Sequence, residues 1–141
     1  MAKKIVVVDD DIDFLSELEE ALRLCDYEVR PFSDPAQVRQ AAVLDKPDLF
    51  LLDMRMHGKS GLQLASELSE DFGLNRPPVI VMTGYFSENE LSQMRLDGIK
   101  ACYTKPFDLF DMLSKIKKLL HEPASQKDFI VSKPFRQENK T

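Results

Sequence analysis

Residues 4–11 read KIVVVDDD, and this stretch decides the fold. Its four consecutive aliphatic residues show no polar alternation, which is typical of a strand inside a parallel sheet that is covered on both faces. Three aspartates follow at once, so the strand ends in an acidic turn. Asp11 is the expected N-cap of the next helix, because its carboxylate can accept a hydrogen bond from the first helical turn.

The same unit, a short apolar strand followed by an amphipathic helix, recurs along the chain. The apolar runs predict strands at residues 4–8, 27–32, 48–52, 79–82 and 101–104. Five strand–helix units in sequence predict an α/β fold, with a parallel sheet and helices on both of its faces.

The helices are indicated by apolar spacing and by capping signals. Apolar residues three or four apart predict helices over 12–25 and 107–120. The stripe of the second helix comprises Phe110, Leu113, Ile116 and Leu120. N-cap signals mark three further helix starts, at Ser60, at Asp34-Pro35 and at the Ser87 capping box.

Length and composition exclude several classes of protein. The 141 residues, of which 43% are hydrophobic and 30% charged, suit one globular domain. The apolar runs are far shorter than the roughly twenty residues of a membrane span, so a cytoplasmic protein is expected. A net charge of -5 weighs against binding to nucleic acid or to an anionic membrane. Cys25 and Cys102 lie in apolar stretches and are expected to be buried free thiols.

Polar side chains follow four of the predicted strands. Asp9 and Asp10 follow the first strand, Asp53 the third, Thr83 the fourth and Lys105 the fifth. In an open α/β sheet the ligand crevice lies beyond the carboxyl ends of the strands. We therefore expect these five residues to converge on one site, although they span almost a hundred positions.

This set of residues suits phosphoryl acceptance. Three clustered carboxylates repel one another unless they bind a proton, a lysine or a cation, and their oxygens are ligands for Mg²⁺ or Mn²⁺. An aspartate can also attack phosphorus to give an aspartyl phosphate. The transferred group needs its oxygen charge neutralised, for which the Lys105 ammonium and the Thr83 hydroxyl are available.

The chain resembles the receiver domains of two-component response regulators, the CheY-like family. The resemblance covers residues 3 to about 121, and four motifs carry it: VVVDDD, LLDMRMHGKSG, VIVMTG and the Lys-Pro-Phe at 105–107. It implies a doubly wound, five-stranded parallel sheet with strand order 2-1-3-4-5.

The resemblance also implies a role for each site residue. Asp53 would be the phosphoacceptor, and Lys105 would pair with a phosphoryl oxygen. The metal ligands would be Asp9, Asp10, Asp53 and the backbone carbonyl of Arg55. Thr83 would turn to hydrogen-bond the phosphoryl group and so act as the switch. The Lys105-Pro106 peptide bond would be cis.

Two departures from the family pattern affect the switch. The fourth position after Asp53 is often proline in the family and is His57 here. The aromatic residue coupled to the threonine usually lies three positions before the lysine, where this chain has Cys102. Tyr103 and Tyr85 are the alternative switch aromatics. Because Arg55 and Tyr85 flank the site and neither is a base toward water, we predict slow self-dephosphorylation.

Other protein classes fit parts of the sequence. Residues 9–20 match the acidic spacing of a calcium EF-hand loop, but Phe14 stands where glycine is required. An aspartyl phosphatase of the haloacid-dehalogenase type would use Asp9 as nucleophile, and a flavodoxin-like electron carrier would share the fold. A pseudo-receiver that binds proteins without being phosphorylated is the main alternative.

The resemblance also sets the expected organisation and partners. We expect a receiver domain over residues 1–121 and a tail or linker over 122–141, without an effector domain. The apolar island at 129–131 could dock that tail on the domain. The expected partners are a histidine kinase or histidine phosphotransfer protein, a downstream protein target and, as an option, a second copy. The expected output surface is formed by the fourth helix, fifth strand and fifth helix. The protein itself is not expected to be an enzyme beyond its own phosphorylation and dephosphorylation.

Overall fold

A computed structural model describes residues 2–122 and 129–132. The strands are β1 Lys4–Val8, β2 Glu28–Phe32, β3 Leu49–Asp53, β4 Val79–Thr83, β5 Ala101–Thr104 and β6 Ile130–Ser132. The α-helices are α1 Ile12–Leu24, α2 Val38–Leu44, α3 Gly61–Phe72, α4 Glu88–Leu96 and α5 Leu109–His121. Short 3-10 helices, η1 Pro35–Gln37 and η2 Gly73–Asn75, precede α2 and follow α3.

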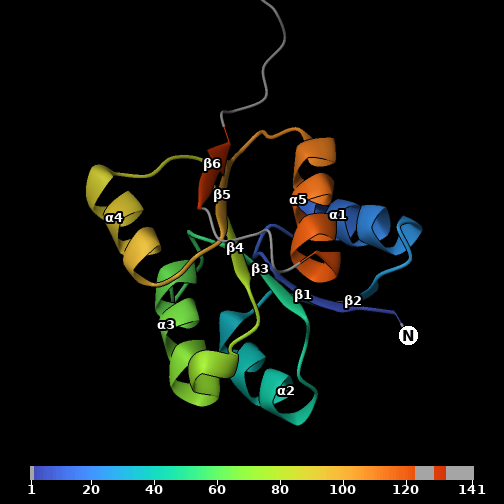
Figure 1. The fold of residues 1–141 in the computed structure, drawn as a ribbon, viewed down its shortest axis with the longest axis horizontal. Coiled ribbons are helices and arrows are strands. Elements are labelled where there is room, and N and C mark those ends of the chain that lie inside the picture. Colours follow the sequence, from blue (N-terminus) through green and yellow to red (C-terminus); the bar gives the residue numbers. More distant parts are fainter. Residues whose placement is uncertain (1, 123–128, 133–141) are drawn as a thin grey trace, which may run out of the picture.

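The strands form one parallel sheet in the order β2-β1-β3-β4-β5-β6. The predicted order of the first five strands is therefore confirmed. The sixth strand, which the prediction did not include, pairs with β5 through residues of the apolar island. Figure 1 shows the sheet in the middle of the molecule, with α1 and α5 on one side and α2, α3 and α4 on the other.

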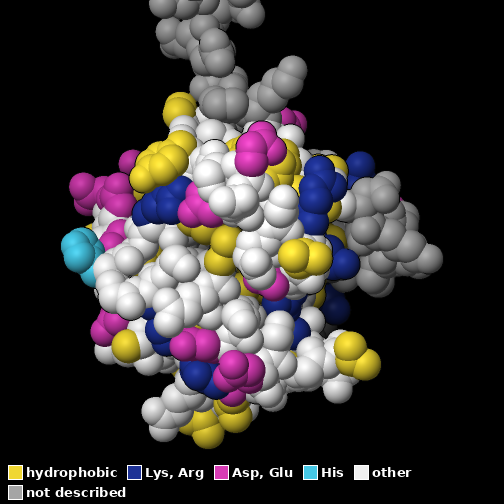
Figure 2. All heavy atoms as spheres, turned by 90° about the vertical axis from the view of Figure 1, so that its left-hand side faces the viewer, with side chains coloured by type: hydrophobic (Ala, Val, Ile, Leu, Met, Phe, Trp, Pro, Cys, Tyr) yellow, Lys and Arg dark blue, Asp and Glu magenta, His cyan; other side chains and the backbone are white. Residues whose placement is uncertain are grey.

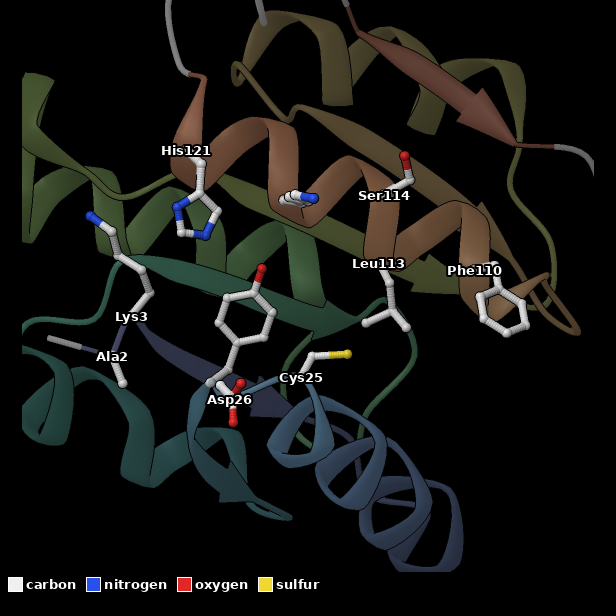
Figure 3. Close-up of a pocket in the computed structure, with 10 residues that line it drawn as sticks. Ala2, Lys3, Cys25, Asp26, Phe110, Leu113, Ser114 and His121 are labelled. Carbon is white, nitrogen blue, oxygen red and sulfur yellow. The ribbon is translucent and has the colours of Figure 1, made fainter.

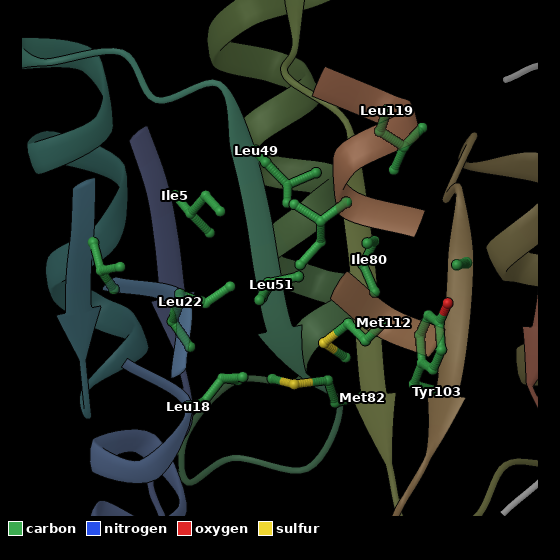
Figure 4. Close-up of a cluster of buried hydrophobic side chains, with 14 of the residues drawn as sticks. Ile5, Leu18, Leu22, Leu49, Leu51, Ile80, Met82, Tyr103, Met112 and Leu119 are labelled. Atoms are coloured by element: carbon green, nitrogen blue, oxygen red, sulfur yellow. The ribbon is translucent and has the colours of Figure 1, made fainter. Parts of the chain in front are cut away.

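Alternation along the strands produces two separate cores. In β1, Ile5 and Val7 belong to the cluster beneath α1 and α5, whereas Val6 and Val8 belong to the cluster beneath α2, α3 and α4. All four side chains are buried, which explains why the strand is apolar throughout. Figure 4 shows the first cluster, in which Leu22 of α1 and Met112 of α5 pack over the sheet.

The predicted capping signals are confirmed. Asp11 accepts a hydrogen bond from the Phe14 amide at 3.2 Å, and Ser60 accepts one from the Gln63 amide at 3.0 Å. Ser87 and Glu90 form the capping box of α4. Asp34 caps the 3-10 helix η1 instead of an α-helix, and α2 begins four residues after Asp34, at Val38.

Two predictions about burial were wrong. Cys25 is exposed, because it ends α1 and lies beyond the last buried turn, whereas Cys102 is buried as expected. Phe110 is 81% exposed, because the buried stripe of α5 is rotated and begins at Met112. Ile116 and Leu120 do face the core.

Candidate functional site

The fold brings the predicted strand-end residues together. Val8 of β1 lies opposite Leu52 of β3, so Asp9 and Asp53 follow as neighbours on adjacent strands. On the other side of β3, Thr83 at the end of β4 pairs with Thr104, and Lys105 comes next. The site is therefore a direct consequence of parallel register at the carboxyl edge of the sheet.

Three carboxylates form an acidic pocket. One oxygen each from Asp9, Asp10 and Asp53 lies within 4.8 Å of the others. Asp9 is completely buried and Asp53 is 6% exposed, while Asp10 is partly exposed. Oxygen donors at this density and charge suit a hard divalent cation. The pocket could hold a metal ion, as receiver domains typically hold magnesium.

Lys105 neutralises part of this charge. Its Nζ lies 2.8 Å from Asp9 Oδ2 and 3.4 Å from Asp53 Oδ1. The ammonium also lies 4.3 Å from the centre of the Phe14 ring, a cation–π contact that fixes it from α1. The sequence analysis did not predict that Phe14 contacts the site. The Lys105-Pro106 bond that follows is cis, as expected.

The environment of Asp53 opposes its ionisation. Burial and the nearby Asp9 charge raise the pKa of the Asp53 carboxyl to about 6, although Lys105 acts in the opposite direction. At pH 7 the carboxylate is still mostly ionised. Asp53 is thus an anion held in a partly desolvated site, which is the protonation state that a nucleophile needs.

His57 occupies the position where the family often has proline, and it contacts Asp10. Its backbone N–H donates to Asp10 Oδ2 at 3.1 Å, and its Nδ1 lies 2.9 Å from the same oxygen. Burial acts to raise the pKa of the Asp10 carboxyl, but the His57 contacts outweigh it and the net shift is downward. The loop after β3 is therefore fixed to the acidic pocket without a proline.

Arg55 joins the same loop to α4. Its guanidinium makes two hydrogen bonds to the Glu90 carboxylate, at 2.7 and 2.8 Å, and a third to the Tyr85 carbonyl at 3.1 Å. It also stacks over the Tyr85 ring at 4.2 Å. Glu90 was predicted only as part of the capping box, since its partner lies 35 residues away in sequence.

The three candidate switch residues lie in different environments. Thr83 is buried, and its hydroxyl donates to the Tyr85 carbonyl at 2.6 Å. Tyr85 is 67% exposed and lies beside Arg55. The structure does not bring Tyr103 to them: the ring is buried beneath α1 and α5, and its hydroxyl donates to the Asp111 carbonyl. Strand alternation explains this, because Cys102 faces α3 and α4 and Tyr103 faces the opposite side.

A shallow depression of about 370 Å³ reaches the acidic pocket at one of its three carboxylates, Asp10. Its lining residues are Asp10, Met54, Arg55, Met56, His57 and Ser60. A separate hollow of about 840 Å³ lies between α5 and the end of α1 (Figure 3). Two of its lining residues, Tyr27 and His121, have stacked rings. None of the five strand-end residues lines this second hollow.

The comparisons with known proteins identify the family. The response regulator receiver domain matches residues 5–117. The phosphate regulon transcriptional regulatory protein PhoB of Pseudomonas aeruginosa is 31% identical over 120 residues, which cover 85% of this chain and 52% of that protein. The transcriptional regulatory protein KdpE of Staphylococcus aureus is 31% identical over 83% of this chain and 49% of its own length. The chain thus spans about half the length of these relatives.

Solved structures agree with this assignment. A CheY-like receiver domain from Methanospirillum hungatei has a TM-score of 0.79 and 26% identity, and the match covers 89% of this chain and 98% of that one. The chemotaxis protein CheY4 of Vibrio cholerae has the same fold, with a TM-score of 0.78 at 20% identity, over 85% of this chain and 100% of that one. The fold and its acidic pocket define a two-component signalling domain. The chain belongs to the CheY-like response regulator receiver family.

Receiver domains are typically signalling domains without enzymatic activity of their own, and their partners are histidine kinases. Within residues 2–122 and 129–132, no helix is long and apolar enough to cross a membrane.

Proposed function

We propose that this chain is a phosphorylation-controlled switch in which Asp53 accepts a phosphoryl group from a phosphohistidine. The donor would be a histidine kinase or a histidine phosphotransfer protein in the cytoplasm. One observation carries this proposal: a buried aspartate lies beside two further carboxylates and within 3.4 Å of a lysine amine. A separate downstream protein, or a second copy of the chain, would read the outcome.

The proposed transfer moves one phosphoryl group between two side chains. A carboxylate oxygen of Asp53 attacks phosphorus, and the bond between phosphorus and the histidine nitrogen breaks with its electron pair passing to the imidazole. The products are an aspartyl phosphate and a free histidine. Lys105 already lies at this carboxylate, so its ammonium is placed to pair with an oxygen of the transferred group.

A divalent cation fits the acidic pocket. Asp9, Asp10, Asp53 and the Arg55 backbone carbonyl would hold Mg²⁺ or Mn²⁺, which when bound neutralises charge on the transferring oxygens. The donor set of carboxylate oxygens is the one that such hard ions prefer. Asp9 is the most buried of these carboxylates. Its Oδ2 pairs with the Lys105 ammonium at 2.8 Å, and its Oδ1 accepts a hydrogen bond from the Asp11 amide at 2.9 Å.

The switch would start from Thr83. Its hydroxyl donates to the Tyr85 carbonyl in the resting state, so donation to a phosphoryl oxygen would break that hydrogen bond. The loop of residues 84–87 leads into α4, and the change would reach the surface formed by α4, β5 and α5. A modification shifts such an equilibrium only through interactions that differ between the two states.

Intact mass spectrometry tests the proposal. The chain is incubated with a small phosphodonor such as acetyl phosphate, with and without Mg²⁺, as wild type, Asp53→Asn and the control Asp26→Asn. We expect one phosphoryl adduct on the wild type and on Asp26→Asn, lost in Asp53→Asn and when the metal is chelated. Absence of an adduct on every form, with a phosphohistidine donor as well, would favour the pseudo-receiver.

A further inference from the structure

The described part of the tail covers the free edge of β5. Ile130 lies opposite Ala101, Val131 opposite Cys102, and Ser132 opposite Tyr103. The Ile130 amide donates to the Lys100 carbonyl at 3.3 Å, and the Thr104 hydroxyl donates to the Ser132 carbonyl at 3.3 Å. In Figure 1 the short β6 arrow lies next to β5 as the edge strand of the sheet, toward α4. These residues therefore occupy part of the expected output surface.

Phe129 anchors this segment to α4. Its ring is partly buried against the cluster that includes Met94 of α4 and Cys102 of β5. The Arg95 guanidinium lies 5.0 Å from the centre of the ring, a cation–π contact from the last turn of the helix. The segment thus contacts both α4 and β5 and is sensitive to their relative position.

The surface that Figure 2 shows carries basic and acidic side chains interspersed with small apolar patches. Residues 129–132 carry no charged side chain, and the contacts that hold them are the pairing with β5 and the packing of the Phe129 ring beneath Arg95. Such backbone pairing along an open strand edge is the usual way in which an extended segment joins a sheet.

Two short routes connect the segment with the phosphorylation site. Thr104, which bonds to Ser132, directly precedes Lys105 and pairs with Thr83. The Lys105 amide also donates to the Thr83 carbonyl at 2.6 Å. The second route runs from the Thr83 hydroxyl through the Tyr85 carbonyl to α4, whose Arg95 holds Phe129. Contacts therefore link Thr83 to both ends of the segment's attachment, at β5 and at α4.

The described part of the segment buries little side-chain surface. Among the described residues it pairs with β5 through Ile130, Val131 and Ser132, and Ile130 and Val131 remain 39% and 37% exposed. Within the described residues the buried Ser132 Oγ has no hydrogen-bond partner. Elements with few buried contacts open at a small free-energy cost, so a modest change at the site can shift their equilibrium.

We propose that residues 129–132 cover the α4–β5 surface of their own chain, and that phosphorylation of Asp53 releases them from it. This inference rests on the proposed function, and it makes the tail part of the switch. Before phosphorylation the segment holds α4 against β5 and denies that edge to a partner. After phosphorylation the edge is open. By reciprocity, a chain whose segment is detached binds the phosphoryl group or its analogue more tightly.

Two measurements on the full chain test the release. The first is hydrogen exchange of the peptide containing residues 129–132, with and without Mg²⁺ and beryllofluoride, an analogue of the bound phosphoryl group. We expect exchange in this peptide to rise about tenfold when beryllofluoride binds, and not in Asp53→Asn. The second is beryllofluoride affinity, which we expect to rise in Phe129→Ala and to stay unchanged in Phe110→Ala, where the same truncation removes an exposed ring.

The possible failures are distinguishable. Fluorine NMR reports whether beryllofluoride is bound, independently of the tail. Bound beryllofluoride with unchanged exchange at residues 129–132, or an unchanged affinity in Phe129→Ala, overturns the release and leaves the phosphoacceptor function intact. Failure of the wild type to bind beryllofluoride contradicts the proposed function, and the release with it.

Discussion

The Asp53 carboxyl lies in an environment that opposes its ionisation. Burial and the Asp9 charge raise the pKa of its carboxyl from 3.8 to about 6. The folded state therefore holds the Asp53 proton more tightly than the unfolded state does. As pH rises from about 4 through 6, ionisation of this one group lowers the free energy of unfolding.

Asp53→Asn is accordingly expected to stabilise the metal-free protein. At pH 7.5 the gain in the free energy of unfolding should be about 1–3 kcal/mol, and it should shrink toward zero near pH 4. Urea denaturation at several pH values measures this difference. Asp26→Asn, at an exposed turn at the other end of the sheet, controls for the loss of one carboxylate. A gain that did not depend on pH would contradict the assigned cause.

Lys105 is expected to matter for stability mainly when the metal is absent. Lys105→Met leaves the fully buried Asp9 carboxylate without its ammonium partner, which should cost about 2 kcal/mol or more. Saturating Mg²⁺ should reduce this cost, because the ion supplies positive charge to the same carboxylates. Thermal unfolding of Lys105→Met and Lys59→Met with and without Mg²⁺ tests this. A cost for Lys105→Met that Mg²⁺ did not change would contradict the shared role.

At the scale of elements, the site depends on how closely α3 approaches β3. A Cβ on Gly61 would lie 2.5 Å from the Asp53 carbonyl oxygen, too close for any real contact. Gly61→Ala should therefore cost about 1–3 kcal/mol of stability through backbone displacement. Gly84→Ala is the matched control, since nothing lies within 4 Å of its added Cβ. Equal denaturation midpoints for the two variants would show that α3 moves freely.

The bridge between Arg55 and Glu90 holds the loop after β3 against α4. Because the pair is partly exposed, Arg55→Ala should change the free energy of unfolding by less than about 1 kcal/mol. The same change opens the site to water, so we expect the phosphorylated form to lose its phosphoryl group several-fold faster. Decay of the phosphoprotein, followed by mass spectrometry, measures this. An unchanged lifetime would contradict the shielding role of Arg55, while Arg39→Ala, in the ion pair with Asp71, should leave the lifetime unaltered.

At the scale of the whole molecule, the two cores lie within residues 5–120, apart from the contact of Phe129. A chain shortened to residues 1–121 is therefore expected to fold and to accept the phosphoryl group. Circular dichroism and the acetyl phosphate assay check this. The shortened chain should also be labelled faster, because it lacks the segment that favours the resting state. Failure to fold would show that β6 is a structural strand and not a displaceable one.

The sequence was sufficient to predict the five-stranded sheet and the convergence at its edge. Strands that are apolar throughout, such as residues 5–8 and 49–52, must be buried on both faces of the sheet. The parallel register of these strands then brings Asp9, Asp53 and Lys105 together. The family resemblance added the strand order and the roles of the residues.

The features that sequence reasoning missed depend on contacts distant in sequence. The three residues of β6 form a strand only because the β5 edge is available to them. Glu90 already has a local partner in the capping box of α4, so the neighbouring sequence does not indicate that it also pairs with Arg55. The orientation of Tyr103 could have been predicted, because side chains alternate along β5 and Tyr103 therefore points to the sheet face away from Cys102.

The central claim is that Asp53 is the phosphoacceptor, and chemical trapping tests it most directly. After incubation with acetyl phosphate and Mg²⁺, borohydride reduces an aspartyl phosphate to homoserine, which peptide mass spectrometry locates in the chain. We predict homoserine at position 53 only, and none when Mg²⁺ or the phosphodonor is omitted. Homoserine at Asp9 or Asp10, or a phosphorylated protein without homoserine, would contradict the assignment of the nucleophile.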